Sequence, residues 1–153
     1  MSRFWNSRVH GLHPYIPGEQ PRLADLLKLN TNESPYGPSP KVLEAIKDSA
    51  EDSLRLYPDP TAQALRETIA TRFGTSPERV FVGNGSDEVL AHTFRALFHN
   101  DAPLLFSDVT YGFYPVYCGL FDQPYRHLPL NDKFEIDIDA YEGPCGGIAI
   151  ATP

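Results

Sequence analysis

Apolar residues along the chain fall into short continuous runs separated by stretches with helical spacing. The runs cover residues 80–82, 103–107 and 147–151, and their length and composition predict buried strands. Tyr125 to Leu128 is a plausible further strand. Residues 134–141, where isoleucines alternate with acids, have a pattern between an edge strand and a loop. The longest apolar segments are therefore strand-length, and the helical segments lie between them.

Helical spacing predicts helices over about residues 39–54, 61–73 and 89–98, and a shorter helix that runs towards Phe121. Ser39 and Pro40 begin the first helix as its N-cap and first helical residue. Gly74 ends the second in a left-handed conformation. We expect the first helix to bury a stripe of apolar side chains: Val42, Leu43, Ile46, Ala50 and Leu54.

Strands that alternate with helices at this spacing indicate an α/β fold with a mostly parallel sheet. Residues 1–38, rich in proline, are expected to form an N-terminal arm and loop, and residues 39–153 part of an α/β domain. The chain stops just after a strand, which leaves a sheet face uncovered. We therefore expect it to be the front part of a longer, truncated chain.

A glycine-rich turn between the strand at 80–82 and the helix at 89–98 is the main candidate for chemistry. Its sequence is Gly83-Asn84-Gly85-Ser86-Asp87-Glu88. A strand that enters a helix through such a turn presents free backbone N–H groups and the positive end of the helix dipole, which together favour a phosphate. The alternative is a plain tight turn with Ser86 as the helix N-cap. The pattern matches neither the nucleotide P-loop nor the dinucleotide fingerprint.

Composition narrows the classes of function. The 153 residues carry a formal net charge of −7 and no run of lysine or arginine, which argues against nucleic-acid binding. No apolar stretch has membrane-spanning length and the N-terminus lacks a signal-peptide core, so we expect a cytoplasmic protein without a membrane partner. Cys118 and Cys145 are expected to be free thiols. The histidines show no metal-ligand spacing, and no metal site is predicted.

Several motifs, in order along the chain, resemble one family: the class I and II aminotransferases of the fold type I pyridoxal-phosphate enzymes, and within them the histidinol-phosphate aminotransferases. The matching stretches are Pro14-Tyr15-Ile16-Pro17-Gly18-Glu19, Leu29-Asn30-Thr31-Asn32-Glu33-Ser34-Pro35-Tyr36-Gly37, Tyr57-Pro58-Asp59-Pro60, Gly83-Asn84-Gly85-Ser86-Asp87-Glu88 and Thr110-Tyr111-Gly112-Phe113-Tyr114.

The resemblance implies roles for particular residues. Gly85, Ser86 and Asp87 would give backbone amides to the 5′-phosphate of pyridoxal 5′-phosphate, with the Asp87 side chain pointing away towards the helix dipole. Tyr111 would stack on the pyridine ring. Tyr57 would reach the cofactor phosphate of a second subunit in a homodimer. Phe113 and Tyr114 are expected to be core aromatics.

Two further residues, Tyr15 and Asn32, are candidate substrate contacts on the arm and its loop. The implied activity is transamination between histidinol phosphate and 2-oxoglutarate in histidine biosynthesis. That chemistry needs a lysine that forms a Schiff base with the cofactor. The chain's lysines lie in segments that do not match that motif, so no catalytic residue is assigned and the chain alone is expected to be inactive.

Three alternatives stay open. A related aminotransferase for aromatic amino acids, or a threonine-phosphate decarboxylase, would share these motifs. A binding module without catalysis could retain only the phosphate cradle. The chain could also be an inactive truncated product.

Overall fold

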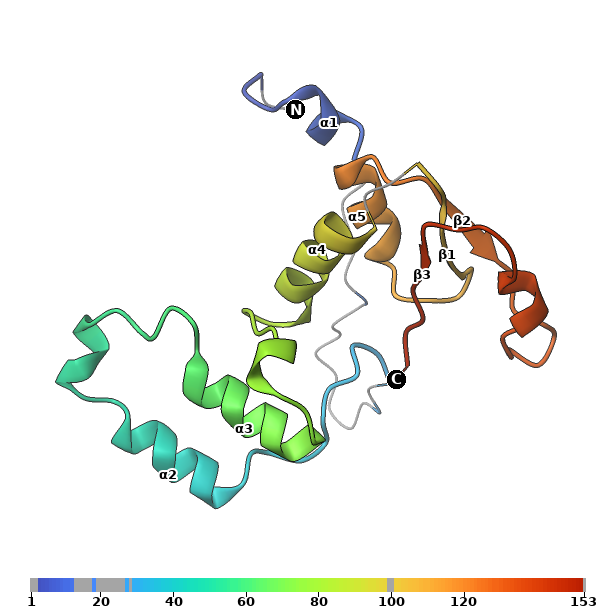
Figure 1. Cartoon of the computed structure of the whole chain (residues 1–153). Coiled ribbons are helices and arrows are strands. Elements are labelled where there is room, and N and C mark those ends of the chain that lie inside the picture. Colours follow the sequence, from blue (N-terminus) through green and yellow to red (C-terminus); the bar gives the residue numbers. More distant parts are fainter. Residues whose placement is uncertain (1–2, 13–17, 19–26, 28, 99–100, 153) are drawn as a thin grey trace. The chain divides into compact units, whose positions relative to one another are not determined.

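The computed structural model describes residues 3–12, 18, 27, 29–98 and 101–152 (Figure 1). Contacts group the chain into two units, one made of Met1–Gln20 with Asn84–Pro153 and the other of Pro21–Gly83. The first unit holds the sheet and the start of the helix that follows the glycine-rich turn. The predicted boundary at residue 38 stays a prediction.

A three-stranded parallel sheet forms the centre of the first unit, in the order β2-β1-β3. Strand β1 (Leu104–Ser107) pairs with β2 (Tyr125–Leu128) and with β3 (Gly147–Ile148). All of β1 is buried, as expected of a central parallel strand. The expected α/β fold with a parallel sheet is therefore confirmed, although β3 is shorter than the predicted 147–151.

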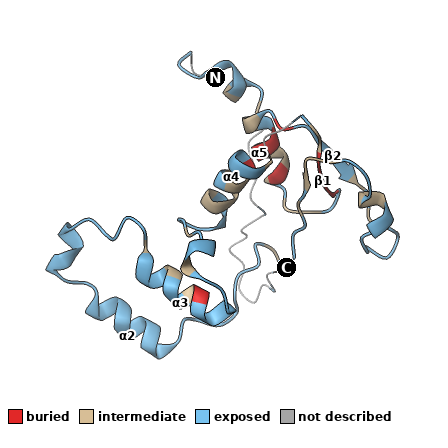
Figure 2. Cartoon of the chain, in the orientation of Figure 1, coloured by how far each residue is buried: buried red, intermediate tan, exposed pale blue. Residues whose placement is uncertain are grey.

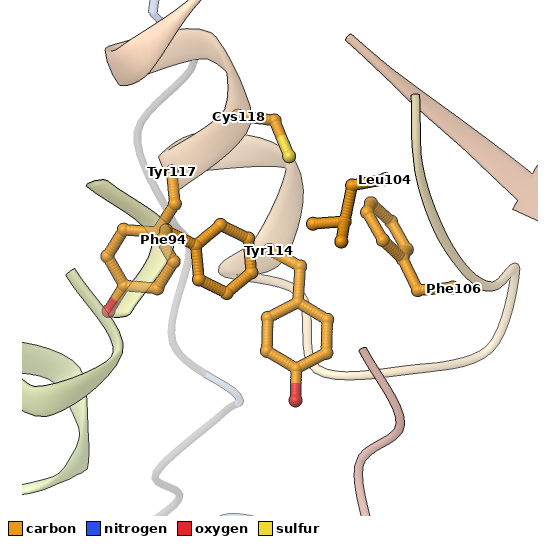
Figure 3. Packing of buried hydrophobic residues seen from close by; sticks show 6 residues of the cluster. All are labelled: Phe94, Leu104, Phe106, Tyr114, Tyr117 and Cys118. Atoms are coloured by element: carbon orange, nitrogen blue, oxygen red, sulfur yellow. The ribbon is translucent and has the colours of Figure 1, made fainter. Parts of the chain in front are cut away.

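Helices α4 (Ser86–Leu97) and α5 (Tyr114–Phe121) supply the rest of this core (Figure 3). The buried cluster consists of Phe94, Leu104, Phe106, Tyr114, Tyr117 and Cys118. Phe94 lies edge-on to Phe98 and tilted against Tyr114 and Tyr117, with ring centroids 5.1–5.5 Å apart. Burying a side chain of this size contributes about 1.5–3 kcal/mol to folding. Because α4 provides Phe94, this packing holds α4 to the unit.

Close packing at the start of β3 requires a glycine. Gly147 has a φ of +149°, and a Cβ there would lie 2.6 Å from the ring of Phe98. Any larger residue would have to displace that ring or the strand.

The second unit contains α2 (Pro40–Asp48), a 3₁₀ turn at Asp52–Arg55, α3 (Gln63–Phe73) and a 3₁₀ turn at Pro77–Arg79. Ser39 caps α2 as predicted, since its side chain accepts a hydrogen bond from the Val42 amide. Gly74 ends α3 with a φ of +64°. At the other end of α3, the Asp59 carboxylate accepts hydrogen bonds from the amides of Thr61 and Gln63, and these lower the pKa of Asp59.

The first predicted helix is shorter than residues 39–54. It ends at Asp48, and the Ala45 carbonyl oxygen accepts both the Ser49 amide at 3.0 Å and the Ser49 hydroxyl at 2.7 Å. Its apolar stripe is also not buried: α2 has no buried residue, and Ile46 and Leu54 are exposed (Figure 2). Among the described residues, no element covers this face.

One predicted strand is wrong, and one segment with an undecided pattern is a loop. Residues 80–82 have no strand partner in the described parts of the chain, because the Val80 carbonyl oxygen instead accepts from Arg66 Nε at 3.0 Å. Residues 134–141, whose pattern lies between an edge strand and a loop, form a loop that ends in a 3₁₀ turn, Ile138–Tyr141. That turn begins where the Asp137 side chain accepts from the Asp139 amide.

Candidate functional site

The first turn of α4 has a backbone geometry that favours an anion. Gly85 is the N-cap, with φ +83° and ψ 171°, a conformation open essentially to glycine alone. The first amides of any α-helix lack acceptors within the helix, and no side chain caps α4. A Cβ added to Gly85 would meet no heavy atom within 4 Å. Open space therefore lies beside free N–H donors and the positive helix end, which suits a phosphate.

The plain-turn alternative, with Ser86 as N-cap, does not describe this geometry. Ser86 is the first helical residue, and Gly85 occupies the N-cap position without any side-chain cap. The amides that a serine N-cap would satisfy are therefore left for another acceptor.

Glu88 shapes the turn from within the helix. Its Oε2 accepts a hydrogen bond from the Asn84 amide at 2.5 Å, so the carboxylate reaches back over the glycine-rich loop. This bond lowers the pKa of Glu88 below its ordinary value of 4.5. Asn84 and Glu88 are four residues apart, which is the spacing of a local cap. The sequence analysis did not predict this hydrogen bond, because it considered only Ser86 as a capping residue.

The lowered pKa of Glu88 predicts how the turn responds to acid. A charged carboxylate is the better acceptor, so the Asn84 bond stabilises the turn fully above pH 4.5 and is lost as pH falls through the lowered pKa. We expect the amide chemical shift of Asn84 to titrate in that window, and Glu88→Gln to abolish the titration. NMR of the amide measures both.

Glu78→Gln is the matched control, because Glu78 is another acid whose pKa is lowered by a local hydrogen bond, mainly from Ser76. It should leave the Asn84 titration unchanged. An Asn84 titration that survives Glu88→Gln would contradict the assignment.

Two tyrosines join Asp87 to the loop after β1 and to α5. The Tyr111 hydroxyl donates to Asp87 Oδ1 at 2.6 Å, and the Tyr117 hydroxyl donates to the Asp87 carbonyl oxygen at 2.8 Å. These partners lie 24 and 30 residues away along the chain. Sequence reasoning placed Asp87 and Tyr111 in one site but did not find this bond, for which the sequence carries no local signal.

Neighbouring rings fix the position of Tyr111. Its ring is edge-on to Tyr114, with centroids 5.7 Å apart, and stacks on Phe113 at 6.2 Å. Tyr114 belongs to the buried core and Phe113 packs against it, so the prediction that both are core aromatics is confirmed. Tyr111 itself is half-buried at the edge of this cluster.

Burial shifts the pKa of two neighbouring groups. It raises the pKa of Tyr117 to about 12, with a smaller contribution from the Asp87 charge, so this phenol remains a hydrogen-bond donor at neutral pH. Burial likewise raises the pKa of Cys118 to about 11, which makes its thiol unreactive. Cys118 and Cys145 are free cysteines, as expected.

The remaining predicted residues lie elsewhere. Tyr57 and Asn32 belong to the other unit, where Tyr57 is fully exposed and Asn32 has a φ of +51°. Tyr15 lies outside the described residues. In the described parts of the chain, histidine, cysteine and acidic side chains form no group suited to a metal ion. Nor does any helix there have the length and apolar character needed to cross a membrane.

Comparison with known proteins gives relatives over the whole chain, although no family model matches. The chain is 80% identical over 153 residues to histidinol-phosphate aminotransferase 2 of Gluconobacter oxydans (strain 621H). It is 61% identical, again over 153 residues, to histidinol-phosphate aminotransferase of Acetobacter pasteurianus. All of this chain and 43% of each relative are covered, so the chain spans less than half the length of these relatives.

A solved structure is also similar. The crystal structure of histidinol-phosphate aminotransferase from Sinorhizobium meliloti in complex with pyridoxal-5′-phosphate matches with a TM-score of 0.60 and 31% identity. The match covers 67% of this chain and 28% of that one. The resemblance to histidinol-phosphate aminotransferases that the motifs indicate is thus confirmed, as is the fold.

Proposed function

We propose, from this similarity along the whole chain, that the protein is part of a pyridoxal-phosphate-dependent aminotransferase that transfers an amino group between histidinol phosphate and 2-oxoglutarate. In this proposal it acts in histidine biosynthesis, in the cytoplasm and as a homodimer. The observation that carries the proposal is the 80% identity over 153 residues to histidinol-phosphate aminotransferase 2 of Gluconobacter oxydans. The hydrogen bond from Tyr111 to Asp87 is consistent with it, because it joins the first turn of α4 to an aromatic ring.

The chain's own residues fit the cofactor. The amides of Ser86 and Asp87, with the open space beside Gly85, would hold the 5′-phosphate. The Tyr111 ring would cover one face of the pyridine ring and keep its plane fixed relative to the substrate. The cofactor, when bound, supplies an electron sink for the bond broken at the substrate α-carbon.

Three further residues, Tyr57, Asn32 and Tyr15, have roles that the resemblance implies. The full exposure of Tyr57 supports a role in reaching the cofactor phosphate of a partner subunit, since such a side chain cannot be packed in its own core. Asn32 and Tyr15 are proposed substrate contacts. No catalytic residue is assigned within these 153 residues, so the proton transfer at the α-carbon would use a lysine supplied from outside them.

A chimera tests this function directly. In it, this chain replaces the matching segment of the Gluconobacter oxydans relative, which supplies the remainder of an enzyme. We expect the chimera to retain pyridoxal phosphate after dialysis, to lose the cofactor's visible absorbance on borohydride reduction, and to transaminate histidinol phosphate with 2-oxoglutarate.

The unmodified relative is the matched control for folding and assay conditions, and the 153-residue chain alone should show neither colour nor activity. A folded chimera that binds no pyridoxal phosphate would overturn the proposal. Activity with aromatic amino acids in place of histidinol phosphate would overturn only the substrate.

A further inference from the structure

The carboxylate of Asp87 raises an electrostatic problem at the first turn of α4. A phosphate held by the turn's amides would be repelled by an acid in the same turn, and α4 has two, Asp87 and Glu88. Each acid is engaged in a specific hydrogen bond instead of facing the open space. Glu88 accepts from the Asn84 amide, and Asp87 accepts from the Tyr111 hydroxyl.

The Asp87 bond differs from the Glu88 bond in what it connects. Glu88 closes a contact within the turn, whereas Asp87 reaches a residue 24 positions away in the loop after β1. Its length of 2.6 Å is typical of a hydroxyl that donates to an ionised carboxylate. The same residue is anchored a second time, because its carbonyl oxygen accepts from the buried Tyr117 hydroxyl at 2.8 Å.

Asp87 therefore contributes two groups that point to different parts of the proposed site. Its backbone N–H belongs to the first turn of α4, and its side chain holds the hydroxyl end of Tyr111. Two neighbouring rings, Phe113 and Tyr114, limit the Tyr111 ring from other directions. The hydroxyl bond is the constraint that orients the ring relative to the helix start.

We propose that Asp87 is a positioning residue whose carboxylate orients the Tyr111 ring and couples ring stacking to phosphate binding. This inference rests on the proposed function, since the ring to be stacked is that of pyridoxal phosphate. Asp87 acts through Tyr111 and takes no part in proton transfer. The negative charge of Asp87 is tolerated beside the phosphate because the Asp87 carboxylate is hydrogen-bonded to the Tyr111 hydroxyl.

Ligand binding to the chimera measures this role without any turnover. Pyridoxamine 5′-phosphate is the probe, because its amine forms no covalent bond with a lysine and its affinity reports the phosphate and ring contacts. We expect Asp87→Ala to weaken its binding about tenfold, and to reduce the circular dichroism induced in the bound ring. Inorganic phosphate, which has no ring, should bind Asp87→Ala as tightly as the parent chimera or more tightly, because a nearby negative charge is removed.

Three further variants separate positioning from other roles. Asp87→Asn keeps an acceptor oxygen and should restore part of the ring signal. In a Tyr111→Phe background, Asp87→Ala should have no additional effect on pyridoxamine phosphate binding, since the partner hydroxyl is already absent. Tyr117→Phe is the matched control: it removes another hydroxyl that bonds to Asp87, and it should leave the ring signal unchanged.

The outcomes distinguish this inference from the proposed function. If the parent chimera binds neither probe, the proposed function fails. If it binds both, and Asp87→Ala leaves the ring signal intact or weakens both probes equally, the positioning role is wrong. Additive effects of Asp87→Ala and Tyr111→Phe would also overturn it.

Discussion

Tyr111→Ala should lower the turnover of the chimera about 100-fold, because misplacement of a reacting group by about 1 Å costs this much in rate. Removing the ring leaves one face of the pyridine ring uncovered, and neighbouring Tyr114 cannot replace it because it is buried in the core. Steady-state turnover with histidinol phosphate measures the loss. The affinity for pyridoxamine phosphate should fall as well, which links the effect to the ring.

Phe134→Ala is a suitable control for Tyr111→Ala. Phe134 is an aromatic residue of the same unit, 75% exposed, and has no part in the proposed site. Its removal should leave turnover unchanged. Turnover of Tyr111→Ala equal to that of the parent would exclude Tyr111 from the site. Tyr111→Phe keeps the ring and should retain most of the turnover, with the loss limited to the Asp87 bond.

Gly85→Val should remove most of the bound cofactor. At φ +83° a β-branched residue is strained by about 1–3 kcal/mol, and the space that its side chain would fill is the space beside the first-turn amides. The backbone would either shift away from this conformation or keep it with the approach of a phosphate blocked. A loss of about 1.4 kcal/mol of phosphate-binding free energy lowers the affinity for the cofactor about tenfold. We therefore expect less than about a tenth of the parent's pyridoxal phosphate to remain after dialysis.

Gly74→Val separates strain from loss of the phosphate site. Gly74 also has a positive φ, +64°, and a Cβ there also meets no heavy atom within 4 Å, but it ends α3 in the other unit. Both variants should be destabilised by similar amounts in urea unfolding, and only Gly85→Val should lose the cofactor. Stoichiometric cofactor in a folded Gly85→Val protein would contradict the assignment of the turn.

Local rules explain why much of the fold was predictable. Ser39 followed by Pro40 specifies a helix start, and Gly74 specifies a helix end, because each acts through its own backbone neighbourhood. The run at β1 was recognisable because a central parallel strand is apolar on both faces.

The errors arose where backbone groups have partners that the apolar pattern does not specify. The apolar run at Val80 has the composition of a strand, but the Arg66 guanidinium takes the Val80 carbonyl oxygen that a neighbouring strand would need. The helix after Ser39 was predicted to be too long for another reason: the Ala50 amide donates to the Lys47 carbonyl oxygen, three residues back, so the helical pattern does not continue beyond this point. Apolar pattern alone does not show which donor reaches a given carbonyl.

For the candidate site, the sequence by itself determined the chemistry of its parts: free amides after Gly85, and an aromatic ring at Tyr111 in a loop that follows a strand. Both depend on backbone conformation and residue type within a few positions. Only the tertiary structure decided that the Tyr111 hydroxyl meets the Asp87 carboxylate. That contact joins residues 24 positions apart, and it exists because β1, α4 and α5 pack through one shared core that brings the two loops together.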